Sequence, residues 1–88
     1  MNENYTYPAS VVRDDAGFYL VTFPDFPEAA TDADSREEAL EEATDALEEA
    51  IAGRMNRGDA IPHPSARKAR QVLVPVPAQM AVKAALYI

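Results

Sequence analysis

The segment Phe23-Pro24-Asp25-Phe26-Pro27 places one carboxylate between two prolines and two aromatic rings. A carboxylate at the end of a strand could bind a metal ion or act as a general base. It could equally accept backbone N–H groups in a tight turn, as aspartate often does beside proline. The segment therefore indicates either a catalytic site or a rigid corner. In a corner, the two rings would be anchors for a partner or ordinary core side chains.

The other polar residues do not form a pattern typical of an enzyme. Asp14 and Asp15 lie in an expected turn, the strand before them carries no acid, and the single histidine, His63, lies between two prolines. A two-metal nuclease needs several converging carboxylates. The chain has no cysteine and its glycines are scattered, so zinc-binding and phosphate-binding patterns are absent. We predict no catalytic residue, no metal and no cofactor; the alternative is a divergent metal-dependent nuclease that uses Asp14, Asp25 and helix acids.

The elements that would position these residues follow the order strand, strand, strand, helix, strand. Alternating aromatic and β-branched residues predict the strands, and the polar turn between the first two predicts a hairpin. Pro8 cannot donate a ladder hydrogen bond, so it indicates an edge or a bulge in the first strand. The expected strands cover residues 5–13, 18–23, 28–32 and 71–75.

A capping box at Ser35-Arg36-Glu37-Glu38 is the clearest local signal in the chain. Apolar residues then recur every three or four positions as far as Met55, and Gly58 is a typical helix stop. We predict a helix over residues 35–57 whose apolar stripe packs on the sheet. The fold class is therefore α+β, with a β-β-β-α-β order and one long helix.

The net charge of −7 is unevenly spread along the chain, with an acidic middle that includes most of this helix. From Glu28 to Glu49 there are ten acids and one base, whereas from Arg54 to the end there are six bases and one acid. An acidic helix repels nucleic acid and attracts a basic protein. The alternative is a solvated face that keeps a small protein soluble. On the binding interpretation, the candidate contacts on the outward face are Glu41, Asp45 and Glu48.

Residues 77–88 are expected to form a helix that is apolar almost all round. Such a helix must be buried, either against another copy of the chain or as the opening of a second domain. We therefore expect a homo-oligomer, a dimer or a tetramer. The sequence shows no secretory signal and no membrane span, so we expect a cytoplasmic protein without a membrane role.

Five motifs in register give the chain a resemblance to a known family. They are Tyr7-Pro8-Ala9, the run from Gly17 to Ala29, the capped helix with Glu38-Ala39-Leu40 and Ala46-Leu47, the link Ile61-Pro62-His63-Pro64-Ser65, and the tail Val74-Pro75-Val76-Pro77 with Lys83-Ala84-Ala85-Leu86-Tyr87. In this order the motifs resemble the HicB antitoxin family. The resemblance implies a partial ribonuclease-H-like sheet with one long helix, which lacks the carboxylate of an active nuclease.

The resemblance also implies a function. Members of the family bind a small basic HicA-type ribonuclease toxin and block its cleavage of messenger RNA, and longer members bind operator DNA and regulate their own operon. It implies a toxin-binding domain over residues 1–75 and the start of a truncated helix-turn-helix-type DNA-binding region over residues 76–88. DNA binding is expected only where that region is complete. The alternatives are the divergent nuclease and a toxin-free assembly module. The candidate toxin contacts are Phe23, Asp25, Phe26, Glu41, Asp45 and Glu48.

Overall fold

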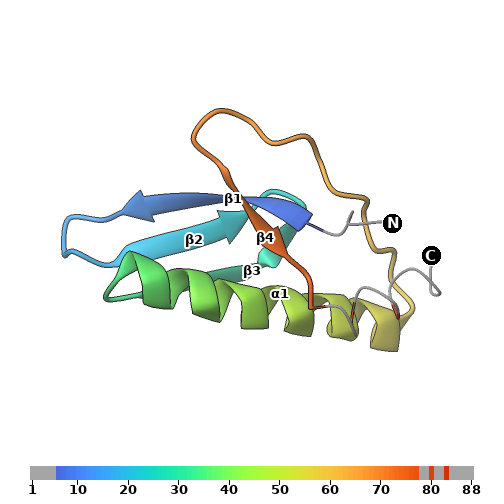
Figure 1. Cartoon of the computed structure of the whole chain (residues 1–88). Helices are drawn as coiled ribbons and strands as arrows, with labels where there is room; N and C mark the ends of the chain where they lie inside the picture. The colour runs from blue at the N-terminus through green and yellow to red at the C-terminus, as the bar shows by residue number, and fades with distance from the viewer. Residues whose placement is uncertain (1–5, 78–79, 81–82, 84–88) are drawn as a thin grey trace.

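A computed structural model describes residues 6–77 together with Met80 and Lys83. One sheet and one long helix make up this part of the chain, and the helix lies along one face of the sheet (Figure 1). The α+β class and the order of elements expected from the sequence are confirmed. The elements are β1 (Thr6–Arg13), β2 (Tyr19–Phe23), β3 (Phe26–Ala33), α1 (Arg36–Arg57) and β4 (Val72–Pro75).

The strands form a four-stranded antiparallel sheet in the order β3-β2-β1-β4. The two halves of β1 pair with different strands: Thr6 to Ala9 pair with β4, and Ser10 to Arg13 pair with β2. Pro8 lies in the first half of β1, opposite Leu73 of β4. Because the β2 pairing begins only at Ser10, the proline occupies a stretch of the strand where its missing N–H is tolerated.

The turn between β1 and β2 forms as its sequence indicates. The Asp14 carboxylate accepts the N–H groups of Ala16 and Phe18, each at 2.9 Å. Gly17 has a φ of 92°, a left-handed conformation that favours glycine. Local side-chain bonds therefore fix this hairpin.

Helix α1 begins and ends where its caps predict. The Ser35 hydroxyl accepts the N–H of Glu38 at 3.1 Å, which is the first half of a capping box. Gly58 adopts a φ of 77° and donates its N–H to the carbonyl of Met55 at 3.2 Å. Arg54 and Arg57 lie in the last turn, where positive charge is favourable.

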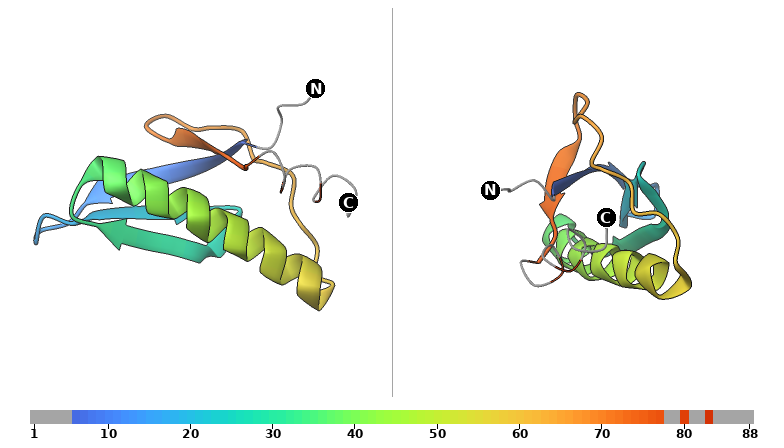
Figure 2. Two further views of the ribbon diagram at one scale, coloured as in Figure 1. Left: turned by 60° about the horizontal axis from the view of Figure 1, so that its bottom comes forward. Right: turned by 90° about the vertical axis from the view of Figure 1, so that its right-hand side faces the viewer.

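The core lies between α1 and the face of the sheet that carries Tyr7 and Val21 (Figure 2). Leu47 and Ile51 of α1 are fully buried there. The other buried helix positions are alanines, so the helix backbone can approach the sheet closely. The buried apolar residues are Tyr7, Ala9, Val21, Phe23, Phe26, Ala29, Ala33, Ala39, Ala43, Leu47, Ala50, Ile51, Ile61, Val74, Val76 and Met80.

The chain between α1 and β4 passes over the sheet on the side away from the helix (Figures 1 and 2). Only part of that face is covered: Pro8 is fully buried, whereas Val12, Leu20 and Leu73 are exposed. The predicted helix over residues 77–88 falls largely outside the described residues. Within the described part of the chain, no helix is apolar and long enough to cross a bilayer.

Candidate protein-interaction surface

Arg54 joins three parts of the fold at the end of α1. Its guanidinium makes two hydrogen bonds to the Glu28 carboxylate on β3, at 2.7 and 2.9 Å, and a third to the carbonyl of Ala60 at 3.2 Å. It also lies 4.7 Å from the centre of the Phe26 ring, within the range of a cation–π contact. This residue therefore fixes the helix end, the β3 strand and the following link against one another.

The Arg54–Glu28 pair shifts the pKa of both groups. Hydrogen bonds from Arg54 lower the pKa of Glu28 below its usual value, and partial burial opposes that shift only in part. The bond to Glu28 raises the pKa of Arg54. With 21% of the Arg54 side chain and 39% of the Glu28 side chain exposed, solvent still screens the pair. The pair therefore holds the end of α1 against β3. Because its two charges offset each other, it offers little net charge to a partner.

Asp25 lies in the turn between β2 and β3 and binds a distant segment. Its carboxylate accepts the Ser65 N–H at 2.9 Å and also the Ser65 hydroxyl. Nearby, the Tyr7 hydroxyl donates to the Pro62 carbonyl at 2.7 Å. Local turn bonds were the expectation for Asp25, but the structure gives bonds across 40 positions of sequence. The corner therefore holds the link between α1 and β4 in place.

The two aromatic rings of this corner belong to the core. Phe26 is fully buried and Phe23 is 2% exposed. The Phe26 ring meets the Tyr7 ring edge-on, with centroids 5.0 Å apart. Of the two interpretations left open by the sequence, core packing is the one that this burial supports, and neither ring is exposed to a partner in this structure.

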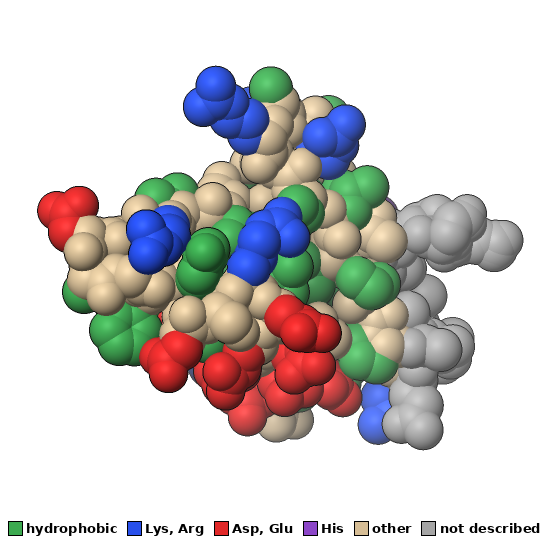
Figure 3. All heavy atoms as spheres, turned by 60° about the vertical axis from the view of Figure 1, so that its left-hand side comes forward, with side chains coloured by type: hydrophobic (Ala, Val, Ile, Leu, Met, Phe, Trp, Pro, Cys, Tyr) green, Lys and Arg blue, Asp and Glu red, His purple; other side chains and the backbone are tan. Residues whose placement is uncertain are grey.

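The outward side of α1 carries an acidic surface of seven carboxylates. Glu41 and Asp45 are exposed, and Glu48 is partly exposed. Thr31 on β3 donates to Glu42 at 3.5 Å, and none of the seven forms a salt bridge with another described residue. Figure 3 shows carboxylates gathered along the lower side of the molecule, where α1 lies. The acidic surface consists of Glu37, Glu38, Glu41, Glu42, Asp45, Glu48 and Glu49.

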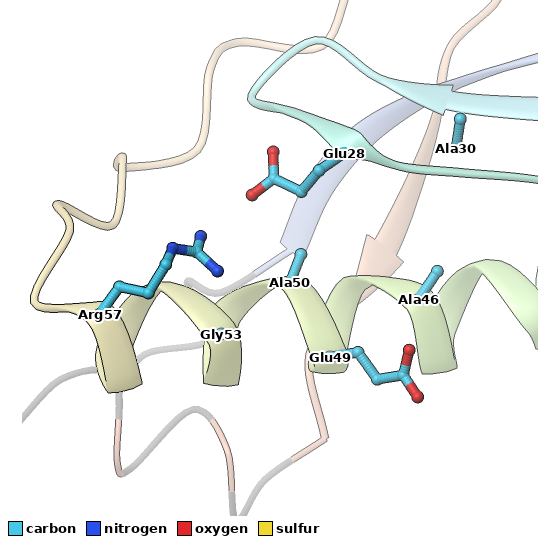
Figure 4. A pocket seen from close by; sticks show the side chains of 7 residues that line it. All are labelled: Glu28, Ala30, Ala46, Glu49, Ala50, Gly53 and Arg57. Carbon is cyan, nitrogen blue, oxygen red and sulfur yellow. The ribbon is translucent and has the colours of Figure 1, made fainter.

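A shallow groove of about 310 Å³ runs between β3 and α1 beside this surface (Figure 4). Its floor is formed by small residues, and Glu28 reaches from β3 toward the side of the groove where Arg57 lies. The groove is open and lacks the enclosed, converging polar groups of a catalytic pocket. The lining residues are Glu28, Ala30, Ala46, Glu49, Ala50, Gly53 and Arg57.

The six candidate contacts thus divide into two separate groups. Phe23, Asp25 and Phe26 lie at the β2–β3 corner, where they stabilise the fold, whereas Glu41, Asp45 and Glu48 lie on the solvent side of α1. Among residues 6–77, Met80 and Lys83, no three histidine or acidic side chains are grouped so that they could hold a metal ion. His63 is exposed in the link.

Arg54, Glu28 and Ser65 are structurally important residues that the sequence analysis did not single out. In the sequence, Arg54 stands out only as the first of the C-terminal bases, and its partner Glu28 is 26 positions away. A basic residue in the last turn of a helix is a weak signal, because most such residues remain solvated.

Comparison with known proteins agrees with this architecture. A family profile described as "HicB_like antitoxin of bacterial toxin-antitoxin system" matches residues 6–85. The crystal structure of the N-terminal domain of the Burkholderia pseudomallei antitoxin HicB superimposes with a TM-score of 0.69, covering 81% of this chain and 96% of that one. The two sequences are 21% identical, so this likeness shows the fold.

Curated relatives extend the agreement to the sequence. "Antitoxin HicB 2" of Photorhabdus laumondii is 42% identical over 86 residues, which cover 98% of this chain and 60% of the relative. "Antitoxin HicB" of Escherichia coli K12 is 35% identical over 80 residues, which cover 91% of this chain and 58% of the relative. The chain thus spans about 60% of the length of these relatives. On the family match, the sequence identity and the shared fold, this chain belongs to the HicB-like antitoxin family of bacterial toxin–antitoxin systems.

Proposed function

We propose that this chain binds and neutralises a small basic HicA-type ribonuclease toxin through the acidic surface of α1. Membership of the antitoxin family supports the general role. The observation that carries the site is the set of seven α1 carboxylates, none of which is in a salt bridge with another described residue. The chain acts by occupying the toxin, without turnover of its own, and it does so in the cytoplasm, where messenger RNA is translated.

Electrostatics explains why this surface suits such a partner. Like charges three or four positions apart on a helix repel one another. A basic protein docked on the surface would relieve this repulsion, and complementary charge would speed and orient the encounter. A nucleic acid would be repelled by the same carboxylates. The surface therefore favours a basic protein over RNA or DNA as the direct ligand.

Co-expression with the basic protein encoded next to this chain tests the proposal. A pull-down measures complex formation, and an RNA-cleavage assay measures whether the partner is silenced. We expect a stable complex and loss of cleavage. Cleavage of RNA by this chain alone, or the absence of any complex, would overturn the proposal and favour the nuclease or the toxin-free assembly module.

The acidic surface is tested separately by reversing the charge of Glu48. Glu48→Lys should weaken the complex, whereas Asp15→Lys, which makes the same charge change at the tip of the β1–β2 turn, should leave it nearly unchanged. Asp15 is exposed and takes no part in the hydrogen bonds of Asp14. If both variants bind the partner as the wild type does, the toxin contacts another face.

Regulation of the operon is a separate proposal. The family relatives are longer than this chain, and DNA binding would require a C-terminal region beyond the toxin-binding domain. Val76 and Met80 lie in the core formed with the sheet and α1. We propose that any DNA-binding region would begin beyond these core positions. Operator binding by the 88-residue chain, measured by gel shift, tests whether that region is needed.

A further inference from the structure

Strand β3 forms one edge of the sheet, and its outer side is unpaired. The strand order is β3-β2-β1-β4, so β3 pairs with β2, and in the described part of the chain no other strand adds to it. One row of its backbone N–H and C=O groups therefore faces away from the sheet. With eight residues, β3 is as long as β1. An unpaired edge of this length is a template for a strand from another protein.

Two hollows flank the middle of this edge, and Ala30 lines both of them. One is the groove of about 310 Å³ between β3 and α1 (Figure 4). The other has a volume of about 370 Å³. Ala30 is exposed and carries only a methyl group, so a strand can approach β3 closely at this point. The larger hollow is lined by Leu20, Ala30, Thr31, Asp32 and Glu42.

Carboxylates predominate around both hollows. Asp32 and Glu42 line the larger hollow and Glu49 lines the groove, and none of the three forms a salt bridge with another described residue. Glu42 and Glu49 also belong to the acidic surface of α1, so the edge of β3 is continuous with that surface. Arg57 is the single base among the described lining residues, and it is paired with Asp59. Such a border disfavours an acidic strand and favours a basic one.

We propose that an extended basic segment of the toxin adds to β3 as a further strand of the sheet. The inference rests on the proposed function, since it takes the toxin as the basic partner. Backbone hydrogen bonds to the outer edge of β3 hold the segment, as is usual in strand addition. Neighbouring side chains of a strand point to opposite faces, so one set enters the groove beside α1 and the next lies over the larger hollow. Lysine or arginine side chains of the segment then meet the carboxylates.

Amide hydrogen exchange tests the added strand directly. NMR follows each amide of β3 in the free chain and in its complex with the co-expressed basic partner. We expect alternate amides of β3 to exchange at least about tenfold more slowly in the complex, because only the outward-facing N–H groups gain a partner. Unchanged exchange along β3 in a complex that forms would refute the added strand and leave toxin binding in place. If no complex forms, both the proposed function and this inference fail.

A substitution at the point where the hollows meet tests the same contact by affinity. Ala30→Arg places a cation and a long side chain where the basic segment should lie, so it should weaken the complex at least about tenfold. Val12→Arg makes the same charge change at an exposed position of β1 and should leave the affinity nearly unchanged. Circular dichroism should give the wild-type spectrum for both variants, because both positions are exposed. Equal affinity of Ala30→Arg and the wild type would contradict the proposal.

A variant of the acidic surface separates strand addition from docking on α1 alone. In Glu48→Lys the affinity should fall, but the complex that still forms at high concentration should show the same slowing along β3. If the slowing disappears there, protection of β3 is an indirect effect of docking on α1, and the proposal is wrong. A second copy of this chain is the other candidate occupant of the edge. Slowing that depends on the concentration of the free chain would identify that copy and would also rule out the toxin segment.

Discussion

Reversing the charge of Glu41 should stabilise the isolated protein while weakening its complex with a basic partner. Glu41 is exposed on α1, one turn from Glu37, Glu38 and Asp45. Each like-charge pair at this spacing costs a few tenths of a kcal/mol. In Glu41→Lys, three repulsive pairs become attractive, so we expect the free energy of unfolding to rise by about 1 kcal/mol at low salt.

Two assays measure the two effects. Urea unfolding followed by circular dichroism gives the stability, and calorimetry with the toxin gives the affinity. Because the added attraction is between exposed charges, high salt should remove most of the gain in stability. Affinity should fall by at least about tenfold if the acidic surface forms the contact. Asp15→Lys is the matched control, and it should change neither quantity appreciably.

The two assays refute different steps of the reasoning. A Glu41→Lys protein that is less stable at low salt would show that the like-charge pairs on α1 do not govern its stability. A variant with unchanged affinity for the toxin would show that this part of α1 lies outside the contact. Loss of both stability and affinity would mean that Glu41 supports the fold, which contradicts its exposed position.

Three further predictions concern the end of α1 and the corner. Arg54→Met should lower the free energy of unfolding by about 2 kcal/mol, because it removes the hydrogen bonds to Glu28 and the cation–π contact with the buried Phe26 ring. As a control, Arg57→Met removes only the exposed ion pair with Asp59, so it should lower the free energy of unfolding by about 0.5 kcal/mol or less. Urea unfolding measures both values. The pKa of Glu28 is lowered on folding, so its stabilising effect is present above the unfolded value of 4.5 and is lost as the pH falls through the folded pKa. The difference in unfolding free energy between wild type and Glu28→Gln should therefore shrink when pH is lowered below that value, and a constant difference would contradict the shift. Asp25→Ala should speed hydrogen exchange at the Ser65 amide and reduce stability by about 1 kcal/mol, and unchanged exchange would show that these bonds do not hold the link.

The helix and the first turn were predictable because their signals are local. Ser35 and Gly58 satisfy backbone groups within a few positions of themselves, so their residue types alone set the ends of α1. The Asp14 carboxylate likewise binds N–H groups two and four positions away. Such local bonds can be predicted from the sequence without knowing the rest of the fold.

The strand ends and the sheet order depended on tertiary pairing. The third strand was expected over residues 28–32, whereas β3 runs from Phe26 to Ala33. The pairing of β2 with β3 has a register shift between Val21 and Phe23, and β3 begins within the corner, at Phe26; no local pattern indicates such an irregularity. The position of β4 beside β1 also depends on the whole chain, because the sequence leaves open which earlier strand it joins.

At the corner, the sequence left open whether the two aromatic rings are buried in the core or exposed to a partner. The types Pro-Asp-Phe-Pro indicated a rigid turn, which the structure has, but they could not tell a buried ring from an exposed one. The burial of Phe26 depends on the Tyr7 ring and on Arg54, which are far away in sequence. The Asp25–Ser65 bonds are equally non-local. A residue's type suggests its possible roles, and only its distant neighbours select one of them.

The energetics of α1 support the proposal that its acidic surface binds a basic partner. Seven pairs of its carboxylates lie three or four positions apart, which costs about 2 kcal/mol in total at a few tenths per pair. Burial of Leu47 and Ile51, at roughly 2 kcal/mol each, offsets this repulsion, so the helix forms in spite of its charge. Solubility alone would be served equally well by mixed charges, which would also add favourable pairs along the helix. A pattern that weakens the free protein and would be relieved by a basic partner is the pattern expected of a surface selected for that partner.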